Sequence, residues 1–119
     1  MAAKILQVED DPEQATLFTQ VLTLSGYAVA SVADAEAAQV LLAGEPFALL
    51  LADWDLGAGM SGDTLIALAK VQYPDLKTIL FSNHPQVNEI AAACGADAAF
   101  RKIEGIMKLR QLVKDVAEM

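Results

Sequence analysis

Short apolar runs alternate along the chain with segments whose apolar residues recur at helical spacing. The run 47–52 is apolar at every position, which is typical of a strand buried on both faces in the centre of a parallel sheet. Five runs have the character of strands: 4–8, 27–32, 47–52, 76–81 and 98–101. Helical periodicity follows each of them, at 12–25, 37–42, 65–69, 86–94 and 106–116.

Local signals mark where several of these helices begin and end. Pro12 suits the first turn of a helix, and Asp34 is a favourable cap for the second helix. Gly26, Gly44 and Gly95 stand where the first, second and fourth helical patterns stop. Five strand-then-helix units with short connections predict an α/β fold, with one doubly wound five-stranded parallel sheet, (βα)5, and right-handed crossovers.

Composition narrows the class of protein. A length of 119 residues fits one domain, 1–119, and the 55% hydrophobic content excludes a disordered chain. The net charge of −8 argues against direct nucleic-acid binding. The single cysteine, Cys94, excludes an internal disulfide and is best interpreted as a small apolar residue. No apolar run approaches the roughly 18 residues of a membrane span, so we expect no membrane insertion and a cytoplasmic location.

Polar residues stand at the carboxyl ends of the predicted strands. Glu9 and Asp10 follow the first, Asp53 the third, Ser82 and Asn83 the fourth, and Lys102 the fifth. In a doubly wound sheet these ends form the ligand-binding edge, so the side chains should converge there. Carboxylates within about 5 Å of one another repel by several kcal/mol, and a cation must neutralise them. A few oxygen ligands suit Mg²⁺ better than a full calcium cage, and one histidine with one cysteine gives no zinc site.

The same residues fit phosphoryl transfer. A carboxylate is able to act as the nucleophile toward phosphorus, and Asp53 ends the most apolar strand. The metal and Lys102 would neutralise the phosphoryl oxygens, while the Ser82 hydroxyl donates a hydrogen bond to one of them. Taken singly, the acidic cluster 9–11 is equally explained by the negative charge favoured at a helix start. It is the joint placement at strand ends that favours a site.

Five pieces of sequence together resemble the receiver domain of two-component response regulators (the CheY-like superfamily). They span nearly the whole chain, in family order: Val8-Glu-Asp-Asp-Pro12, Leu51-Ala-Asp-Trp54, Met60-Ser-Gly62, Leu80-Phe-Ser82 and Gly95-Ala-Asp…Lys102. The resemblance implies a flavodoxin/CheY-like fold with strand order 2-1-3-4-5. It also implies Mg²⁺-dependent transfer of phosphate onto Asp53 from a histidine kinase or histidine phosphotransfer protein.

The resemblance assigns further roles by motif position. Asp10 and Asp53 would bind Mg²⁺ (or Mn²⁺) directly, Glu9 through water, and Asp55 through its backbone carbonyl. Ser82 matches the switch hydroxyl and Lys102 the phosphoryl-binding lysine. Such a domain catalyses only its own aspartyl phosphorylation and dephosphorylation, and signals by conformational change to a downstream protein target or effector domain. His84, expected to be an exposed loop residue, stands with Asp55 where the family tunes dephosphorylation.

Three positions depart from the family pattern. Gly57 replaces a proline, Ala99 replaces the aromatic residue three positions before the lysine, and Ile103 replaces the proline after it. Because cis peptides are costly before residues other than proline, we expect a trans Lys102–Ile103 bond. Phe100 would face the other side of its strand and so could not stand in for the aromatic residue. We therefore expect the signal to leave through the loop 83–86 and the fourth helix.

Two other functions stay open. A pseudo-receiver would keep the fold as a phosphorylation-independent binding module, and the departures favour it while the complete acidic triad does not. A haloacid-dehalogenase-like phosphatase also forms an aspartyl phosphate, but its acidic pair follows its lysine, whereas Glu9 and Asp10 precede Lys102 here. Finally, the last 19 residues hold five basic side chains, which either balance a helix dipole or form a partner surface: Arg101, Lys102, Lys108, Arg110 and Lys114.

Overall fold

The computed structural model describes residues 3–119 as strands and helices in strict alternation. The strands are β1 (Lys4–Val8), β2 (Ala28–Val32), β3 (Leu49–Asp53), β4 (Lys77–Ser82) and β5 (Ala98–Arg101). The helices are α1 (Pro12–Leu24), α2 (Ala35–Gly44), α3 (Gly62–Gln72), α4 (Val87–Cys94) and α5 (Ile106–Ala117). A short 3₁₀ turn, η1 (Lys102–Glu104), joins β5 to α5.

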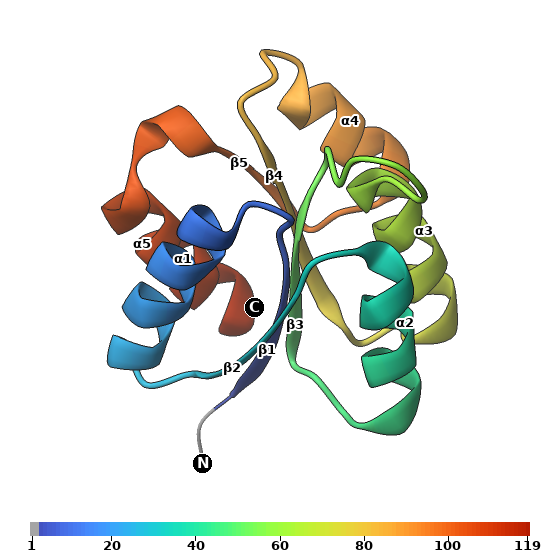
Figure 1. Ribbon diagram of the computed structural model, residues 1–119, viewed down its shortest axis with the longest axis horizontal. Coiled ribbons are helices and arrows are strands. Elements are labelled where there is room, and N and C mark those ends of the chain that lie inside the picture. The colour runs from blue at the N-terminus through green and yellow to red at the C-terminus, as the bar shows by residue number, and fades with distance from the viewer. Residues whose placement is uncertain (1–2) are drawn as a thin grey trace.

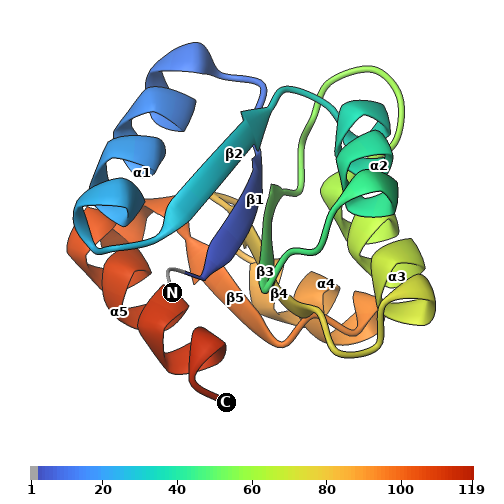
Figure 2. The same ribbon diagram turned by 90° about the horizontal axis from the view of Figure 1, so that it is seen from below.

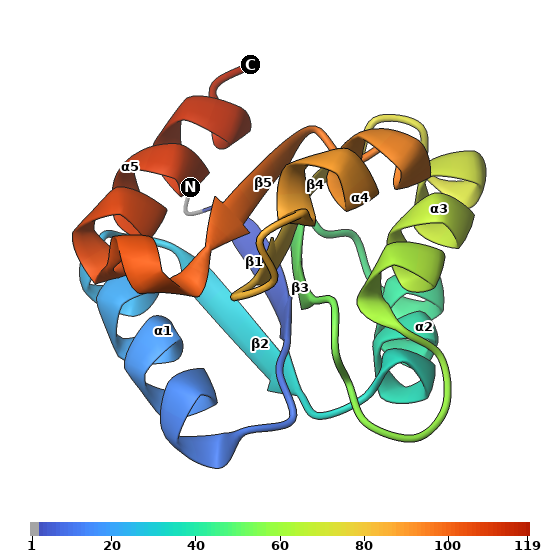
Figure 3. The same cartoon turned by 90° about the horizontal axis from the view of Figure 1, so that it is seen from above.

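All five strands are parallel and form one sheet in the order β2-β1-β3-β4-β5, which confirms the predicted doubly wound fold. Figure 1 shows α1 and α5 on one face of this sheet and α2, α3 and α4 on the other. Figures 2 and 3 show the same sandwich from its two ends. Every residue of the central strand β3 is buried, as its apolar sequence predicts.

Successive side chains along each strand point to opposite faces of the sheet and so belong to two separate hydrophobic cores. Leu50 and Ala52 pack under α2, α3 and α4, whereas Leu49 and Leu51 pack under α1 and α5. Ala99 and Phe100 of β5 divide in the same way, so Phe100 does face away from Ala99. Both faces of the sheet are therefore covered, and the open space for ligands lies at its edges.

The predicted helix signals are found in place. The Asp11 side chain accepts a hydrogen bond from the Glu13 N–H just before Pro12, and Asp34 accepts one from the Ala37 N–H. Gly95 ends α4 with a φ of 82°, a left-handed conformation that favours glycine. These caps fix the points at which the chain leaves and re-enters the sheet.

β3 and β4 end one residue later than the apolar pattern predicts. Asp53 pairs with Phe81 in the β3–β4 ladder, and Ser82 pairs with Arg101 in the β4–β5 ladder. The apolar run stops at this point because the side chains of Asp53 and Ser82 lie at the open edge of the sheet. The strands continue for one more residue because the backbones of these residues still pair with neighbouring strands. Asp53 and Ser82 are consequently held by the sheet and not by flexible loops.

Two further features bear on the sequence analysis: the geometry of the peptide bonds and the length and polarity of the helices. Within residues 3–119 all peptide bonds are trans, which confirms the prediction for Lys102–Ile103. In the same part of the chain, no helix is both long enough and apolar enough to cross a membrane.

Candidate phosphoryl-transfer site

Three carboxylates meet where β1 and β3 end. One oxygen from each of Glu9, Asp10 and Asp53 lies within 4.8 Å of the others. Glu9 and Asp53 are almost completely buried, whereas Asp10 is exposed. The Glu9 backbone N–H still donates to the Val32 carbonyl at 3.0 Å, which anchors the acidic pair to the neighbouring strand β2. Because parallel strands end at the same edge of the sheet, Glu9 and Asp53 lie close together although they are 44 positions apart in the sequence.

Lys102 joins two of these carboxylates. Its Nζ lies 2.8 Å from Asp53 Oδ2 and 3.2 Å from Glu9 Oε2, and 5.1 Å from the centre of the Phe81 ring. Burial alone would lower the pKa of Lys102, but the hydrogen bonds and charges of Asp53 and Glu9 outweigh it and raise that pKa. The lysine therefore remains a cation and neutralises part of the negative charge at this edge.

The pKa of Glu9 is raised by its surroundings. Burial raises its pKa to about 7, the hydrogen bond from the Asp11 backbone N–H opposes that rise, and the Asp53 charge adds to it. The Asp11 N–H lies 3.0 Å from Glu9 Oε1 and Lys102 binds Oε2, so both carboxylate oxygens have a donor. A cation close to this group favours its ionised form.

Asp53 is oriented by a hydrogen bond to each of its carboxylate oxygens and by close packing at its backbone. Its Oδ1 accepts a hydrogen bond from the Asp55 N–H at 3.2 Å, while its Oδ2 accepts from Lys102. Behind it, the backbone of Gly62 at the start of α3 packs directly on the Asp53 carbonyl, where a Cβ would overlap that oxygen. The close approach explains glycine in the Met60-Ser-Gly62 motif and fixes α3 against the end of β3.

Ser82 and His84 form the opposite wall of the site. Ser82 Oγ accepts a hydrogen bond from the His84 backbone N–H at 3.0 Å. The His84 ring packs edge-on against Trp54, with ring centres 4.7 Å apart and an interplanar angle of 89°. His84 Nδ1 in turn accepts from the Gln86 N–H at 3.1 Å. The expectation that His84 is exposed is wrong: it is half-buried, because Trp54 covers one edge of its ring.

Asp55 lies at the rim of the site. Its side chain is exposed, and its Oδ1 accepts from the Gly57 N–H at 3.1 Å, which ties the carboxylate to the loop that leads to α3. The carboxylate is therefore not a fourth member of the acidic cluster. A metal-binding role for the Asp55 backbone carbonyl stays a prediction.

The predicted residues line a single open cavity of about 450 Å³. Its wall also includes Asn83, which follows β4 beside Ser82, and three residues that the sequence reasoning did not assign to the site: Asp11, Gln14 and Trp54. Asp11 and Trp54 directly follow predicted site residues, which is the signal that could have identified them. Gln14 carries no such signal, because it reaches the cavity from the first turn of α1, four residues after Asp10.

The comparisons with known proteins agree with this geometry. The model of the response regulator receiver domain family matches residues 5–115, and the chain belongs to that family. A receiver domain protein from Methanospirillum hungatei has the same fold with a TM-score of 0.91 and 27% identity, over 99% of this chain and 95% of its own. Chemotaxis protein CheY4 of Vibrio cholerae, at 21% identity and a TM-score of 0.89 over 98% and 99% of the two chains, supports the fold.

Curated relatives carry the same domain in longer proteins. The response regulator protein FleR of Pseudomonas aeruginosa is 36% identical over 99 residues, which is 83% of this chain and 21% of that protein. The sensor protein TorS of Escherichia coli is 37% identical over 82 residues, 68% of this chain and 9% of that protein. The chain thus spans about a fifth or less of the length of these relatives.

Proposed function

We propose that this receiver domain takes a phosphoryl group onto the Asp53 carboxylate from a phosphohistidine of a histidine kinase or a histidine phosphotransfer protein. The observation that carries the proposal is the Lys102 contact with Asp53 beside two further carboxylates. An Asp53 oxygen forms a bond to phosphorus while the bond between phosphorus and the donor nitrogen breaks. In this proposal Lys102 neutralises the phosphoryl oxygens, and the Ser82 hydroxyl donates a hydrogen bond to one of them.

The donor set suits a hard divalent cation. Glu9, Asp10 and Asp53 supply only oxygen ligands, and the exposed Asp10 leaves one side open to water, as Mg²⁺ prefers. In this proposal Asp10 and Asp53 bind Mg²⁺, or Mn²⁺, directly, with Glu9 acting through water and Asp55 through its carbonyl. A bound Mg²⁺ would supply positive charge for the oxygens of the transferring group.

We further infer that the signal leaves the site through the β4–α4 loop. His84 links three parts of this region: its N–H binds Ser82, its ring covers Trp54, and its Nδ1 accepts from Gln86 at the start of α4. A turn of the Ser82 hydroxyl toward a phosphoryl group would disturb the first of these contacts. Ala99 on β5 offers no side chain that could move instead, so α4 is the element best placed to respond.

The proposed partners follow from this role. A sensor histidine kinase or a histidine phosphotransfer protein would supply phosphate, and a downstream protein or effector domain would bind the altered loop and α4. The pseudo-receiver alternative predicts the same fold without phosphate uptake. Membership of the receiver family and the order of the acidic residues weigh against the haloacid-dehalogenase-like phosphatase.

Phosphate uptake separates these functions. The protein is incubated with acetyl phosphate and Mg²⁺, in parallel with a sample containing a chelator, and its intact mass is measured over time. The proposal predicts that one phosphate is gained in the Mg²⁺ sample alone. An unchanged mass at every time point would identify a pseudo-receiver.

A further inference from the structure

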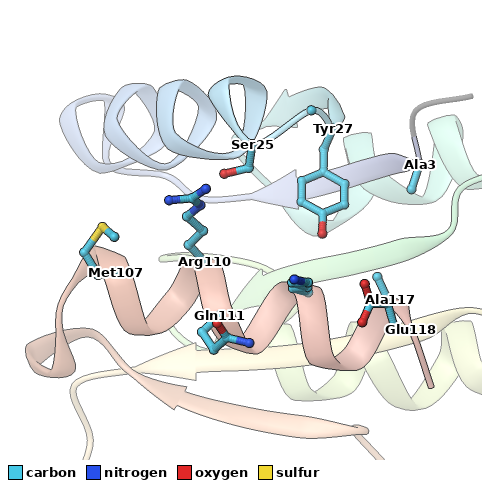
Figure 4. Close-up of a pocket in the computed structure, with 10 residues that line it drawn as sticks. Ala3, Ser25, Tyr27, Met107, Arg110, Gln111, Ala117 and Glu118 are labelled. Atoms are coloured by element: carbon cyan, nitrogen blue, oxygen red, sulfur yellow. The ribbon is translucent and has the colours of Figure 1, made fainter.

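A cavity of about 680 Å³ lies along α5, away from the carboxylates. Figure 4 shows α5 on one side of it and the turn between α1 and β2 on the other, with Tyr27 pointing toward α5 and Arg110 reaching toward Ser25. Most of its lining residues lie at the amino edge of the sheet, near the start of β1 and the end of α5. None of them belongs to the phosphoryl-transfer site.

Two of the residues that line this cavity are bases without an ionic partner. Within residues 3–119, Arg110 and Lys114 form no salt bridge and no side-chain hydrogen bond, and both are exposed. Four other bases in the same part of the chain do pair with acids: Lys4, Lys70, Lys102 and Lys108. Lys77 and Arg101 also form no salt bridge in residues 3–119, but only Arg110 and Lys114 lie together along one cavity.

Basic residues are concentrated at the C-terminal end of the chain, which includes α5. Residues 1–100 contain only three of the eight bases, and the final 19 residues contain the other five. Compensation of the α5 dipole accounts for Lys114 in the last turn, but not for Lys108 in the first turn, where no acid is present. Lys102 binds Asp53 and Glu9, and Lys108 pairs with Glu104. Arg110, which lies before the last turn of α5, is explained by neither the dipole nor an ion pair, and a surface for a negatively charged partner accounts for it.

From these contacts we propose that the cavity along α5 is a docking site for an acidic amphipathic helix of a partner protein. Arg110 and Lys114 are four residues apart, so they stand about 6 Å apart along the helix axis. Carboxylates four residues apart on a partner helix have the same spacing. Met107, whose exposed fraction is 65%, and the ring of Tyr27 offer apolar contact beside them.

Other occupants fit this cavity less well. A small free anion binds best where backbone N–H groups point at it, as at a helix N-terminus, whereas α1 and α5 meet this cavity with their C-termini. A partner helix would have to place its carboxylates at Arg110 and Lys114 and away from Glu118 and these helix ends. A second copy of the chain would bring another net charge of −8 to the same surface. Basic side chains on long, flexible stems are better suited to the carboxylates of a protein helix.

The test uses two synthetic helical peptides. One places glutamates four residues apart beside a face of leucines, and the other has glutamine in place of each glutamate. Amide shifts of the 119-residue chain are followed at low salt during titration with each peptide. The proposal predicts shifts at residues 25–27 and 107–118 with the glutamate peptide only. Binding should weaken about five- to tenfold in the double variant Arg110→Gln, Lys114→Gln.

A matched double variant, Lys77→Gln and Lys108→Gln, removes the same charge outside the cavity and should bind the peptide within about twofold of the wild type. An equal loss in the two double variants would show non-specific charge attraction and overturn the proposal. It is also overturned if the glutamate peptide produces no shifts at residues 25–27 and 107–118 up to millimolar concentration. The same shifts with inorganic phosphate at equal concentration would assign the cavity to small anions instead.

Discussion

The Lys102 ammonium group lies 2.8 Å from Asp53 Oδ2, although the two residues are 49 positions apart in the sequence. The parallel sheet produces this contact because β3 and β5 flank β4 and end at the same edge. The lysine therefore faces the position where negative charge would accumulate during phosphoryl transfer. Its contribution to the reaction is open to direct measurement.

Replacing Lys102 by methionine keeps most of the side-chain volume and removes the charge. We expect Lys102→Met to slow Mg²⁺-dependent labelling by acetyl phosphate about 100-fold, because a positively charged donor at the reacting oxygens is lost. Lys108→Met is the matched control, since Lys108 is exposed and pairs only with Glu104 at 3.8 Å. Labelling rates are measured by intact mass. A wild-type rate in Lys102→Met would show that Lys102 does not contribute to the reaction.

Two glycines at helix ends give opposite predictions for stability. Gly62→Ala places a Cβ on the Asp53 carbonyl, so we expect the free energy of unfolding to fall by about 3 kcal/mol. Gly44→Ala meets no atom within 4 Å at the end of α2, so a gain of about 0.5–1 kcal/mol is expected. Urea unfolding of both variants is the measurement. Equal effects would mean that α3 does not pack against the end of β3 as the structure has it.

Asp97 gives the domain a defined response to acid. Burial alone would raise its pKa, but hydrogen bonds from Thr78 and the charge of Lys70 outweigh this effect and lower the pKa. Oδ2 of Asp97 lies 2.7 Å from the Thr78 N and 3.1 Å from Lys70 Nζ. Because the folded pKa lies below the unfolded value of about 3.9, this stabilisation is present above that pH and is lost as the pH falls through the folded pKa.

The variant Asp97→Asn should therefore lower the free energy of unfolding by about 1–3 kcal/mol at pH 7, with a smaller difference from the wild type below about pH 4. Urea unfolding at several pH values measures both. Asp75→Asn, at an exposed site in the turn before β4, serves as the control and should change neither the stability nor its pH dependence. A difference for Asp97→Asn that stays constant down to pH 3 would contradict the assignment.

The contacts of His84 predict how a phosphoryl mimic affects the fold. With Mg²⁺ and beryllofluoride, we expect amide shifts at Ser82 and across residues 83–90. In His84→Ala the backbone N–H that binds Ser82 is kept, but the ring contacts with Trp54 and Gln86 are lost. The shifts at 87–90 should therefore shrink, while those beside Asp53 remain. Asn83→Ala, in the same loop, is the control. Shifts confined to residues 98–101 and α5 in the wild type would refute this route.

The sequence predicts the backbone arrangement better than it predicts side-chain neighbours. Strand ends follow from apolar runs, and parallel strands end at one edge, so the convergence of Glu9, Asp53 and Lys102 could be expected before any coordinates were known. The packing of His84 on Trp54 could not, because it depends on how two loops from different strands approach each other. The one-residue extension of β3 and β4 also depends on neighbouring strands, which apolar patterning does not record.

The choice of Asp53 as phosphoacceptor is tested most directly by comparing two aspartates two residues apart. Asp53→Asn removes the buried carboxylate that Lys102 contacts, whereas Asp55→Asn changes an exposed side chain and keeps its backbone carbonyl. Intact mass is measured after incubation with acetyl phosphate and Mg²⁺. The account predicts one added phosphate on the wild type and on Asp55→Asn, and none on Asp53→Asn. Labelling of Asp53→Asn to the wild-type level would contradict it.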